Sequence, residues 1–194
     1  MDYSEAISLH LKESAIVKEK TIHACLPQIQ KVIDITAQAL QNGHKILICG
    51  NGGSAADSQH IAAEFVIRLS HTLRRPAIPA LALTTDSSVL TAGANDIGFE
   101  NVFARQIEAF GQPGDILIGI TTSGNSANIL KAIETAKSKK MITIGLLGNQ
   151  GGQCRNLVDL PVIVPSDNTQ YIQETHITIG HIIVELVEKT LFAQ

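Results

Sequence analysis

Short apolar segments alternate with longer amphipathic ones from residue 45 to the end of the chain. The apolar runs lie at residues 46–49, 80–83, 116–120, 142–147 and 160–164. Helical spacing of apolar residues predicts helices at about 55–69, 87–92, 99–109, 127–138 and 169–191. Strands that are apolar at every position are typical of a parallel sheet covered by helices on both faces. We therefore expect an α/β fold: a five-stranded parallel sheet in a flavodoxin-like, three-layer sandwich.

The first 43 residues precede this alternation and are predicted to form two helices. The second helix is expected at about 27–41 and should stop near Gly43. Together with the 169–191 helix they offer more apolar surface than one small sheet covers, so a homo-oligomer is expected. The 194 residues are enough for one domain. We predict a single domain, with residues 1–43 used in oligomerisation and residues 44–194 forming the α/β core.

The composition argues against several classes of protein. Hydrophobic residues make up 44% of the chain and charged residues 17%, which is unlike a disordered segment. A net charge of −3 without a basic tract gives no case for binding nucleic acid. No apolar run is long enough to span a membrane, and the N-terminus has no signal-peptide pattern. The three cysteines, at positions 25, 49 and 154, suggest neither disulfides nor a thiolate zinc site, so a cytoplasmic protein is expected.

Two polar turns each follow an apolar run and precede a predicted helix. They are GNGGS, ending at Ser54, and TTSGNS, from Thr121 to Ser126. Helix starts offer unpaired N–H groups and a positive dipole end, and hydroxyl groups suit a phosphate monoester. One such turn is explained by ordinary N-capping, whereas two at the same edge of a parallel sheet favour phosphate binding. The first turn lacks both the Lys-Ser/Thr ending of a P-loop and the third glycine of a dinucleotide motif.

His60 and Glu64 lie four residues apart and therefore share one face of the 55–69 helix. They could be zinc ligands, an acid/base pair or an ordinary surface pair. Far downstream, Gln173, His176 and His181 lie on the last predicted helix, where the histidines could equally be packing or surface residues. Spacing in the sequence cannot say whether the two helices meet.

Four segments resemble a known family over nearly the whole chain. They are CGNGGSAADSQHIAAEF, LTTDSSVLTAGANDIGFENVFARQIEA, GDILIGITTSGNSANILKAI and YIQETHITIGHIIVELVE. The chain resembles the SIS (sugar isomerase) domain family and, within it, the bacterial phosphoheptose isomerases. The resemblance implies conversion of sedoheptulose 7-phosphate to D-glycero-D-manno-heptose 7-phosphate by enediol(ate) proton transfer, the first step of nucleotide-activated heptose biosynthesis.

The resemblance also implies a role for particular residues. Glu64 and His181 would be the catalytic pair, and one zinc ion per subunit would be held by His60, Glu64, Gln173 and His181. Arg68 would be an active-site cation one turn beyond Glu64. The phosphate and sugar would contact a larger set of residues: Asn51, Gly52, Gly53, Ser54, Glu64, Arg68, Asn95, Asp96, Thr121, Thr122, Ser123, Ser126 and Gln173. Members of the family are homotetramers with active sites at subunit interfaces, and the resemblance implies the same for this chain.

One difference and two alternatives accompany this resemblance. Gln170 and Tyr171 stand where the family often has a small residue and an arginine, which puts a substrate contact from that arginine in doubt. A related SIS group is a non-catalytic scaffold that binds the replication initiator protein, but it lacks the equivalents of Glu64 and His181. A regulator that senses sugar phosphates would carry an added DNA-binding domain, and residues 1–43 show no helix-turn-helix character.

Overall fold

The computed structural model describes residues 2–71 and 73–192, so the extreme ends of the predicted domain lie outside the described residues. Five strands form one parallel sheet in the order β2-β1-β3-β4-β5. Their bounds are β1 Ile46–Gly50, β2 Ala80–Ala82, β3 Ile116–Thr121, β4 Ile142–Leu147 and β5 Leu160–Ile163. This is the flavodoxin-like strand order, and the predicted fold class is confirmed.

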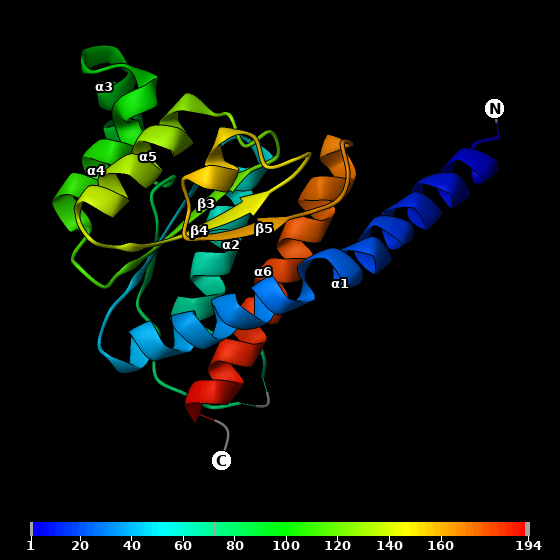
Figure 1. Cartoon of the computed structure of the whole chain (residues 1–194), viewed down its shortest axis with the longest axis horizontal. Coiled ribbons are helices and arrows are strands. Elements are labelled where there is room, and N and C mark those ends of the chain that lie inside the picture. The colour runs from blue at the N-terminus through cyan, green and yellow to red at the C-terminus, as the bar shows by residue number, and fades with distance from the viewer. Residues whose placement is uncertain (1, 72, 193–194) are drawn as a thin grey trace.

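Six α-helices surround the sheet (Figure 1). They are α1 Ser4–Gln41, α2 Gly53–Val66, α3 Ser87–Asp96, α4 Val102–Phe110, α5 Ala127–Ser138 and α6 Thr169–Phe192. Short 3₁₀ helices lie at Phe99–Asn101 and Gln153–Asn156. The predicted helices from residue 55 onward are all present, although the one expected at 99–109 is divided into a 3₁₀ turn and α4.

Alternate residues of each strand enter two separate cores, because side chains on a strand point to opposite faces. Ile46 and Ile48 pack with α1, α2 and α6 on one face. Leu47 and Cys49 pack with α4 and α5 on the other. Burial raises the pKa of the Cys154 thiol to about 11 and also raises that of Cys49, so the expectation of an inert, buried Cys49 is confirmed.

The N-terminal segment is one helix of 38 residues, and the prediction of two helices is wrong. Pro27 lies inside α1, where its ring removes one backbone hydrogen bond at a cost of about 3 kcal/mol. Both sides of this proline pack on the same core, through Val17 and Cys25 before it and Val32 and Ile33 after it. The burial of these side chains outweighs the missing hydrogen bond, so α1 continues through Pro27. It ends at Gln41, close to Gly43, where the second predicted helix was expected to stop.

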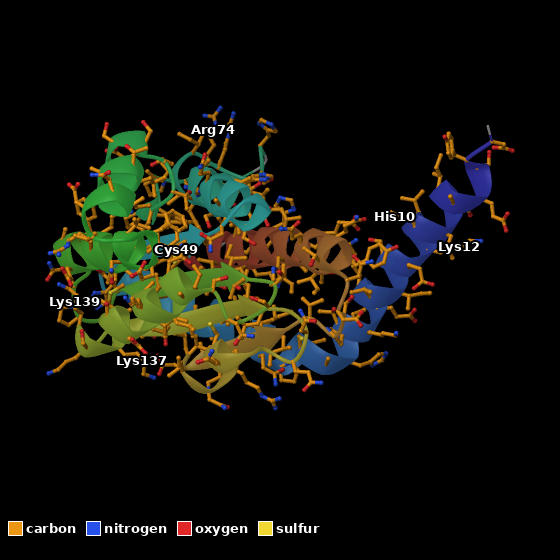
Figure 2. The ribbon with its side chains drawn as sticks, turned by 90° about the horizontal axis from the view of Figure 1, so that it is seen from above. His10, Lys12, Cys49, Arg74, Lys137 and Lys139 are labelled. Carbon is orange, nitrogen blue, oxygen red and sulfur yellow. The ribbon has the colours of Figure 1, made fainter. Side chains whose placement is uncertain are left out.

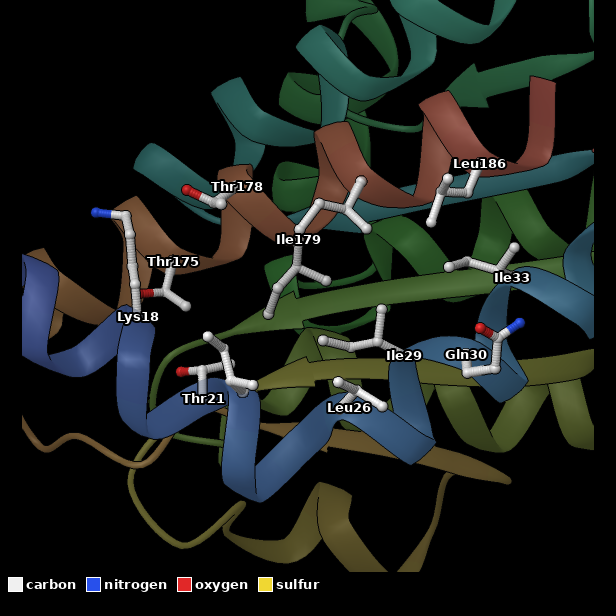
Figure 3. A pocket seen from close by; sticks show the side chains of 12 residues that line it. Lys18, Thr21, Leu26, Ile29, Gln30, Ile33, Thr175, Thr178, Ile179 and Leu186 are labelled. Atoms are coloured by element: carbon white, nitrogen blue, oxygen red, sulfur yellow. The ribbon is translucent and has the colours of Figure 1, made fainter. Parts of the chain in front are cut away.

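The first turns of α1 extend beyond the α/β body, as the positions of His10 and Lys12 make clear (Figures 1 and 2). Ile7, Leu9 and Leu11 are 58%, 58% and 65% exposed on this part of the helix. Farther along, α1 and α6 enclose an apolar groove of about 340 Å³, whose lining includes Leu26 and Ile179 (Figure 3). Apolar surface of this extent is unusual on a chain that stays monomeric.

His176 is a packing residue of α6 and is completely buried. Its Nε2 donates a hydrogen bond of 3.0 Å to the backbone oxygen of Leu147, at the end of β4, and its Nδ1 has no partner among the described residues. Burial lowers the pKa of the His176 ring to about 4, and the bond to Leu147 offsets this only in part. Near neutral pH the folded state therefore contains the uncharged form of the His176 ring.

This histidine should make stability depend on pH in the acid range. The pKa of the folded state lies below the unfolded value of 6.5, so protons favour the unfolded chain. Through His176 the free energy of unfolding should fall by about 3 kcal/mol between pH 7 and pH 4. Urea unfolding of the wild type and of His176→Gln across this range measures the difference. Equal pH dependence in the two proteins would contradict the assignment.

Candidate active site

The predicted edge of the sheet carries both polar turns. β1 and β3 are neighbours at the point where the strand order reverses, and the two turns leave their carboxyl ends. Gly50 closes β1, and a Cβ there would lie 2.5 Å from the backbone oxygen of Ser54. The chain therefore turns too tightly for any larger residue. Ser54 is buried in the first turn of α2, where N–H groups and the positive dipole end favour an anion.

Hydroxyl groups gather in the second turn. The Thr121 hydroxyl lies 3.1 Å from that of Ser126 and 3.5 Å from that of Ser123. Ser126 is the N-cap residue of α5, yet its side chain makes no capping hydrogen bond. Ordinary N-capping therefore does not explain this serine, and the three hydroxyls form a polar surface at a helix start.

Asn51 and Asn128 tie the two turns together. Their side-chain amides form reciprocal hydrogen bonds of 2.9 and 2.8 Å. This pair fixes the start of α2 against the start of α5. The predicted contact between Asn51 and a sugar stays a prediction, since one donor and one acceptor of its amide are already used in this way.

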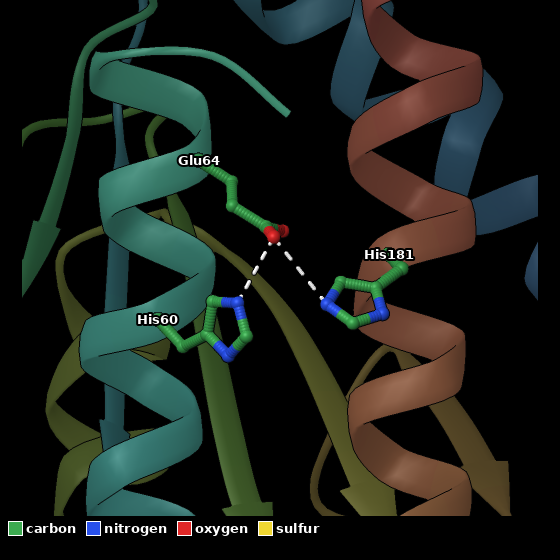
Figure 4. A group of neighbouring side chains, drawn as sticks. All are labelled: His60, Glu64 and His181. Carbon is green, nitrogen blue, oxygen red and sulfur yellow. Dashed lines mark ion pairs between the residues drawn. The ribbon is translucent and has the colours of Figure 1, made fainter. Parts of the chain in front are cut away.

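His60, Glu64 and His181 meet between α2 and α6 (Figure 4). Glu64 Oε1 lies 3.0 Å from Nε2 of His60 and 3.3 Å from Nε2 of His181. The two imidazole rings are nearly perpendicular, with centroids 5.1 Å apart. Ligand atoms of all three side chains lie within 4.8 Å of one another, which suits a single metal ion. Glu64 thus has a second histidine partner beyond the pair on one helix face, and its role as a metal ligand or acid/base group stays a prediction.

The carboxylate of Glu64 uses only one of its oxygens in this cluster. Oε2 is buried and has no hydrogen-bond partner among the described residues. A buried carboxylate oxygen without a partner is costly unless a ligand or water completes it. Glu64 is thus set up to contact something that is not part of the chain itself.

Asp57 belongs to the same site and was missed in the sequence. Its Oδ2 is also buried without a partner among the described residues. Burial raises the pKa of Asp57, while the nearby His60 and His181 lower it. Asp57 precedes His60 by three residues and Glu64 by seven, so all three share one face of α2. That spacing could have identified it.

The helices that carry the cluster approach closely at Gly180. A Cβ at this position would lie 2.6 Å from Cδ1 of Ile61, so any larger residue would force the Ile61 side chain to shift where α6 crosses α2. Close to this contact, the side chains of Glu64 and His181 lie 3.3 Å apart. Gly180 immediately precedes His181 in the chain, yet nothing in the sequence indicates its partner.

Gln173 lies two turns away from His60 along the helix pair. Its side-chain amide contacts Gly53, at the N-terminus of α2, where an added Cβ would lie 2.6 Å from Nε2. Gly53 and His60 are separated by about 10 Å of helical rise. The part of Gln173 as a fourth metal ligand therefore stays a prediction.

Arg68 does not lie one turn beyond Glu64 on the helix, and this placement is corrected. α2 ends at Val66, before the expected end at residue 69, because its last carbonyl groups bond elsewhere. The Phe65 oxygen accepts from the N–H of Ile78, and the Glu64 oxygen accepts from Arg75. Arg68 is an exposed residue of the following loop, and its role as an active-site cation stays a prediction.

Asn95 and Asp96 lie at the end of α3, and their side chains are exposed and hydrogen-bonded to each other at 2.7 Å. Figure 1 places α3 at the far side of the sheet from α6. Their predicted contact with the sugar stays a prediction. Thr122, another residue of the predicted set, lies in the second polar turn. Its backbone oxygen accepts a hydrogen bond of 2.9 Å from the side chain of Asn149.

Tyr171, which departs from the family pattern, faces α1. Its hydroxyl lies 3.4 Å from Nδ1 of His10, and the two rings have centroids 4.9 Å apart. The backbone N–H of Gln170 donates to Asn168 at the start of α6. The contacts of Tyr171 join α6 to the N-terminal helix, whereas that of Gln170 lies within the start of α6.

Comparison with known proteins identifies the class. The family model described as SIS domain matches residues 10–148, so the chain belongs to the SIS domain family. The phosphoheptose isomerase of Clostridium acetobutylicum is 52% identical over 190 residues, covering 97% of this chain and 96% of that protein. That of Chlorobaculum tepidum is 50% identical over 97% and 91% of the two chains.

Solved structures agree. The phosphoheptose isomerase from Francisella tularensis superposes with a TM-score of 0.92 at 38% identity, and that from Neisseria gonorrhoeae with 0.90 at 39%. Each comparison covers 97% of this chain and 100% of the other. The chain is therefore a member of the phosphoheptose isomerase family and is an isomerase. The non-catalytic scaffold alternative is not supported.

A methyl group at position 180 should disturb the packing of α2 on α6. Gly180→Ala is expected to lower the free energy of unfolding by about 1 kcal/mol, because overpacking outweighs the gain in helix propensity. Ile61→Val removes the Cδ1 atom in contact and should recover most of this loss in the double variant. Urea unfolding of the three proteins tests the contact, and a Gly180→Ala protein as stable as the wild type would contradict it.

Proposed function

We propose that this protein converts sedoheptulose 7-phosphate to D-glycero-D-manno-heptose 7-phosphate, the first step of nucleotide-activated heptose biosynthesis. The observation that carries the proposal is the meeting of Glu64 and His181, which lie far apart in the chain, at one point between α2 and α6. Membership of the phosphoheptose isomerase family supports the substrate. The hydroxyl-lined turns support a phosphorylated ligand.

The phosphate group is proposed to bind at the starts of α2 and α5. Ser54, Ser123 and Ser126, with Thr121 and Thr122 beside them, supply hydroxyl and N–H donors there. Binding energy from a phosphate remote from the reacting carbons orients those carbons without taking part in the reaction. Gly52 and Gly53 allow close approach of the backbone, and Asn51 and Gln173 lie beside the same turn.

A zinc ion fits the cluster of His60, Glu64 and His181. Two imidazole nitrogens and a carboxylate oxygen are ordinary zinc ligands. The unpartnered oxygens of Glu64 and Asp57 support a missing positive charge at this point. Gln173 is proposed as a fourth ligand. When bound, the metal would supply Lewis-acid polarisation of the substrate carbonyl.

The chain's own residues account for the proton movements. Glu64 would take a proton from C1 of the ketose, giving an enediol(ate), and return it to C2 of the aldose. Oε1 faces the two histidines, so the carboxylate that would carry the proton lies beside the proposed acid, His181. His181 would serve the oxygens of the substrate, as an acid where negative charge develops and as a base where the hydroxyl proton leaves.

Several features support a homotetramer with sites at subunit interfaces. The exposed apolar side chains of α1 and the groove beside α6 need a covering partner. Asn95, Asp96 and Arg68 are exposed and would reach the substrate of a neighbouring subunit. We propose that α1 is used in oligomerisation.

The described part of the chain has no helix able to span a membrane. Separately, three buried, free cysteines suit the proposed cytoplasmic setting.

Removing either member of the catalytic pair should stop the reaction. Glu64→Gln and His181→Ala are each expected to lower turnover of sedoheptulose 7-phosphate by at least about 100-fold, the usual contribution of an acid or base. Each variant should keep the oligomeric mass of the wild type in light scattering, because neither side chain belongs to the apolar surface of α1.

The same assay, with zinc-loaded and chelator-treated wild type, tests the metal. Loss of activity on chelation and its return with zinc are the expected results. Well-folded, zinc-loaded protein that converts no sedoheptulose 7-phosphate would refute the proposed function. Capture of the replication initiator by such an inactive protein would point to the scaffold alternative.

Asp57 should act on the cluster through the histidine rings. A carboxylate near metal-binding imidazoles orients them and raises their basicity, and its loss typically weakens metal binding 10- to 100-fold. Asp57→Asn is therefore expected to raise the Kd for zinc by about tenfold or more. Calorimetric titration of metal-free protein measures this. An unchanged Kd would show that Asp57 has no part in the site.

A further inference from the structure

A buried ion pair lies at the far end of the helix pair that carries the cluster. Arg75 of the loop after α2 and Glu188 of α6 have side chains only 1% and 3% exposed. The Nε of Arg75 donates to Oε1 of Glu188 at 2.8 Å, and Nη2 donates to the same oxygen. Neither residue belongs to the predicted site, and no sequence motif drew attention to them.

Arg75 also contacts the backbone of the catalytic carboxylate. Its Nη2 donates a hydrogen bond of 2.7 Å to the main-chain oxygen of Glu64. This oxygen lies in the last turn of α2, where carbonyl groups have no partner within the helix. The guanidinium group therefore holds the end of α2 at the residue whose side chain meets His60 and His181.

Glu188 places the other end of this connection on α6. It follows His181 by seven residues, which is about two turns on the same face of the helix. The backbone N–H of Leu69 also approaches Glu188 Oε1, at 3.5 Å. One buried carboxylate thus joins the segment leaving α2 to the helix that carries His181.

Stability alone is a weak reason for such a pair. Removing two charges from water costs several kcal/mol per ion, and apolar replacements of similar volume are often neutral or stabilising. What a buried pair with fixed geometry does provide is a defined relative position. A slide of α2 along α6 would break the bonds of Arg75 to Glu188 and to the Glu64 oxygen together.

We propose that Arg75 and Glu188 are positioning residues, which fix α2 against α6 so that Glu64 meets His181. This role rests on the function proposed above, since it matters only where the cluster binds metal and transfers protons. Gly180 permits the close approach of the helices, and the buried pair sets their register.

Arg75→Lys is the most direct test. Lysine keeps the positive charge opposite Glu188 but lacks the planar fork that reaches two acceptors in fixed directions. For sedoheptulose 7-phosphate, kcat should fall on the order of 10- to 100-fold, as expected for a small misplacement of catalytic groups. KM should change by less than about threefold, because the phosphate turns lie at the other end of α2. The Kd for zinc alone, measured by calorimetry on metal-free protein, should rise about tenfold.

Glu185→Gln is the matched control. It removes an exposed ion pair between Glu185 and Lys189, which lies on the same helix and contacts no residue of the cluster. Its kcat and zinc Kd should equal those of the wild type. A change as large as that of Arg75→Lys would show that an unrelated polar substitution at this end of the helix pair has the same effect, which would overturn the proposal.

The outcomes separate positioning from mere stabilisation. Arg75→Lys with wild-type kcat and zinc Kd, but a lower melting temperature, would overturn the proposal. If this variant does not fold, Glu188→Gln carries the test, because a neutral amide keeps the size of the side chain but binds Arg75 more weakly than a carboxylate does. An unchanged zinc Kd in that variant would equally overturn it. If the wild type itself shows no turnover, the proposed function fails, while the zinc titrations still decide whether the pair positions the cluster.

Discussion

The contact of α2 with α6 is the constraint on which the site depends. Glu64 and His181 are separated by more than half of the chain and meet only because the two helices pack side by side. Gly180 lets them approach, and the buried Arg75–Glu188 pair lies where α2 ends. The sheet supports this arrangement from one face, since Ile61 and Phe65 of α2 and Ile179 and Ile183 of α6 enter the same core.

Much of the fold could be predicted because local pattern and tertiary environment agree. The strands are buried on both faces, so their sequences are apolar throughout, and the predicted runs at 142–147 and 127–138 match β4 and α5 residue for residue. Pro27 is where local reasoning failed. A proline is a strong local signal to end a helix, but the packing of residues on both sides of it decided the outcome.

The candidate site likewise combines residues that could be paired from the sequence with residues that only tertiary packing brings together. His60 and Glu64 share a helix face and could be paired from their spacing, and the two polar turns could be placed at one sheet edge from the order of elements. The partnership with His181, the burial of Asp57 and the reach of Arg75 to the Glu64 oxygen depend on tertiary packing. His181 could be assigned to the site through the family resemblance. Arg75 belongs to no motif, and its contact with Glu64 exists only in the folded structure.

One rigid element, α2, carries both the proposed anion-binding turn and the carboxylate of Glu64. Ser54 and Glu64 are ten residues apart on α2, a helical rise of about 15 Å. Because both residues belong to one helix, the backbone geometry of α2 fixes the distance between Ser54 and Glu64, and no loop adjusts it. A ligand that contacts both groups would therefore meet them at a spacing set by the helix itself. Changes in the surrounding loops would leave this spacing as it is.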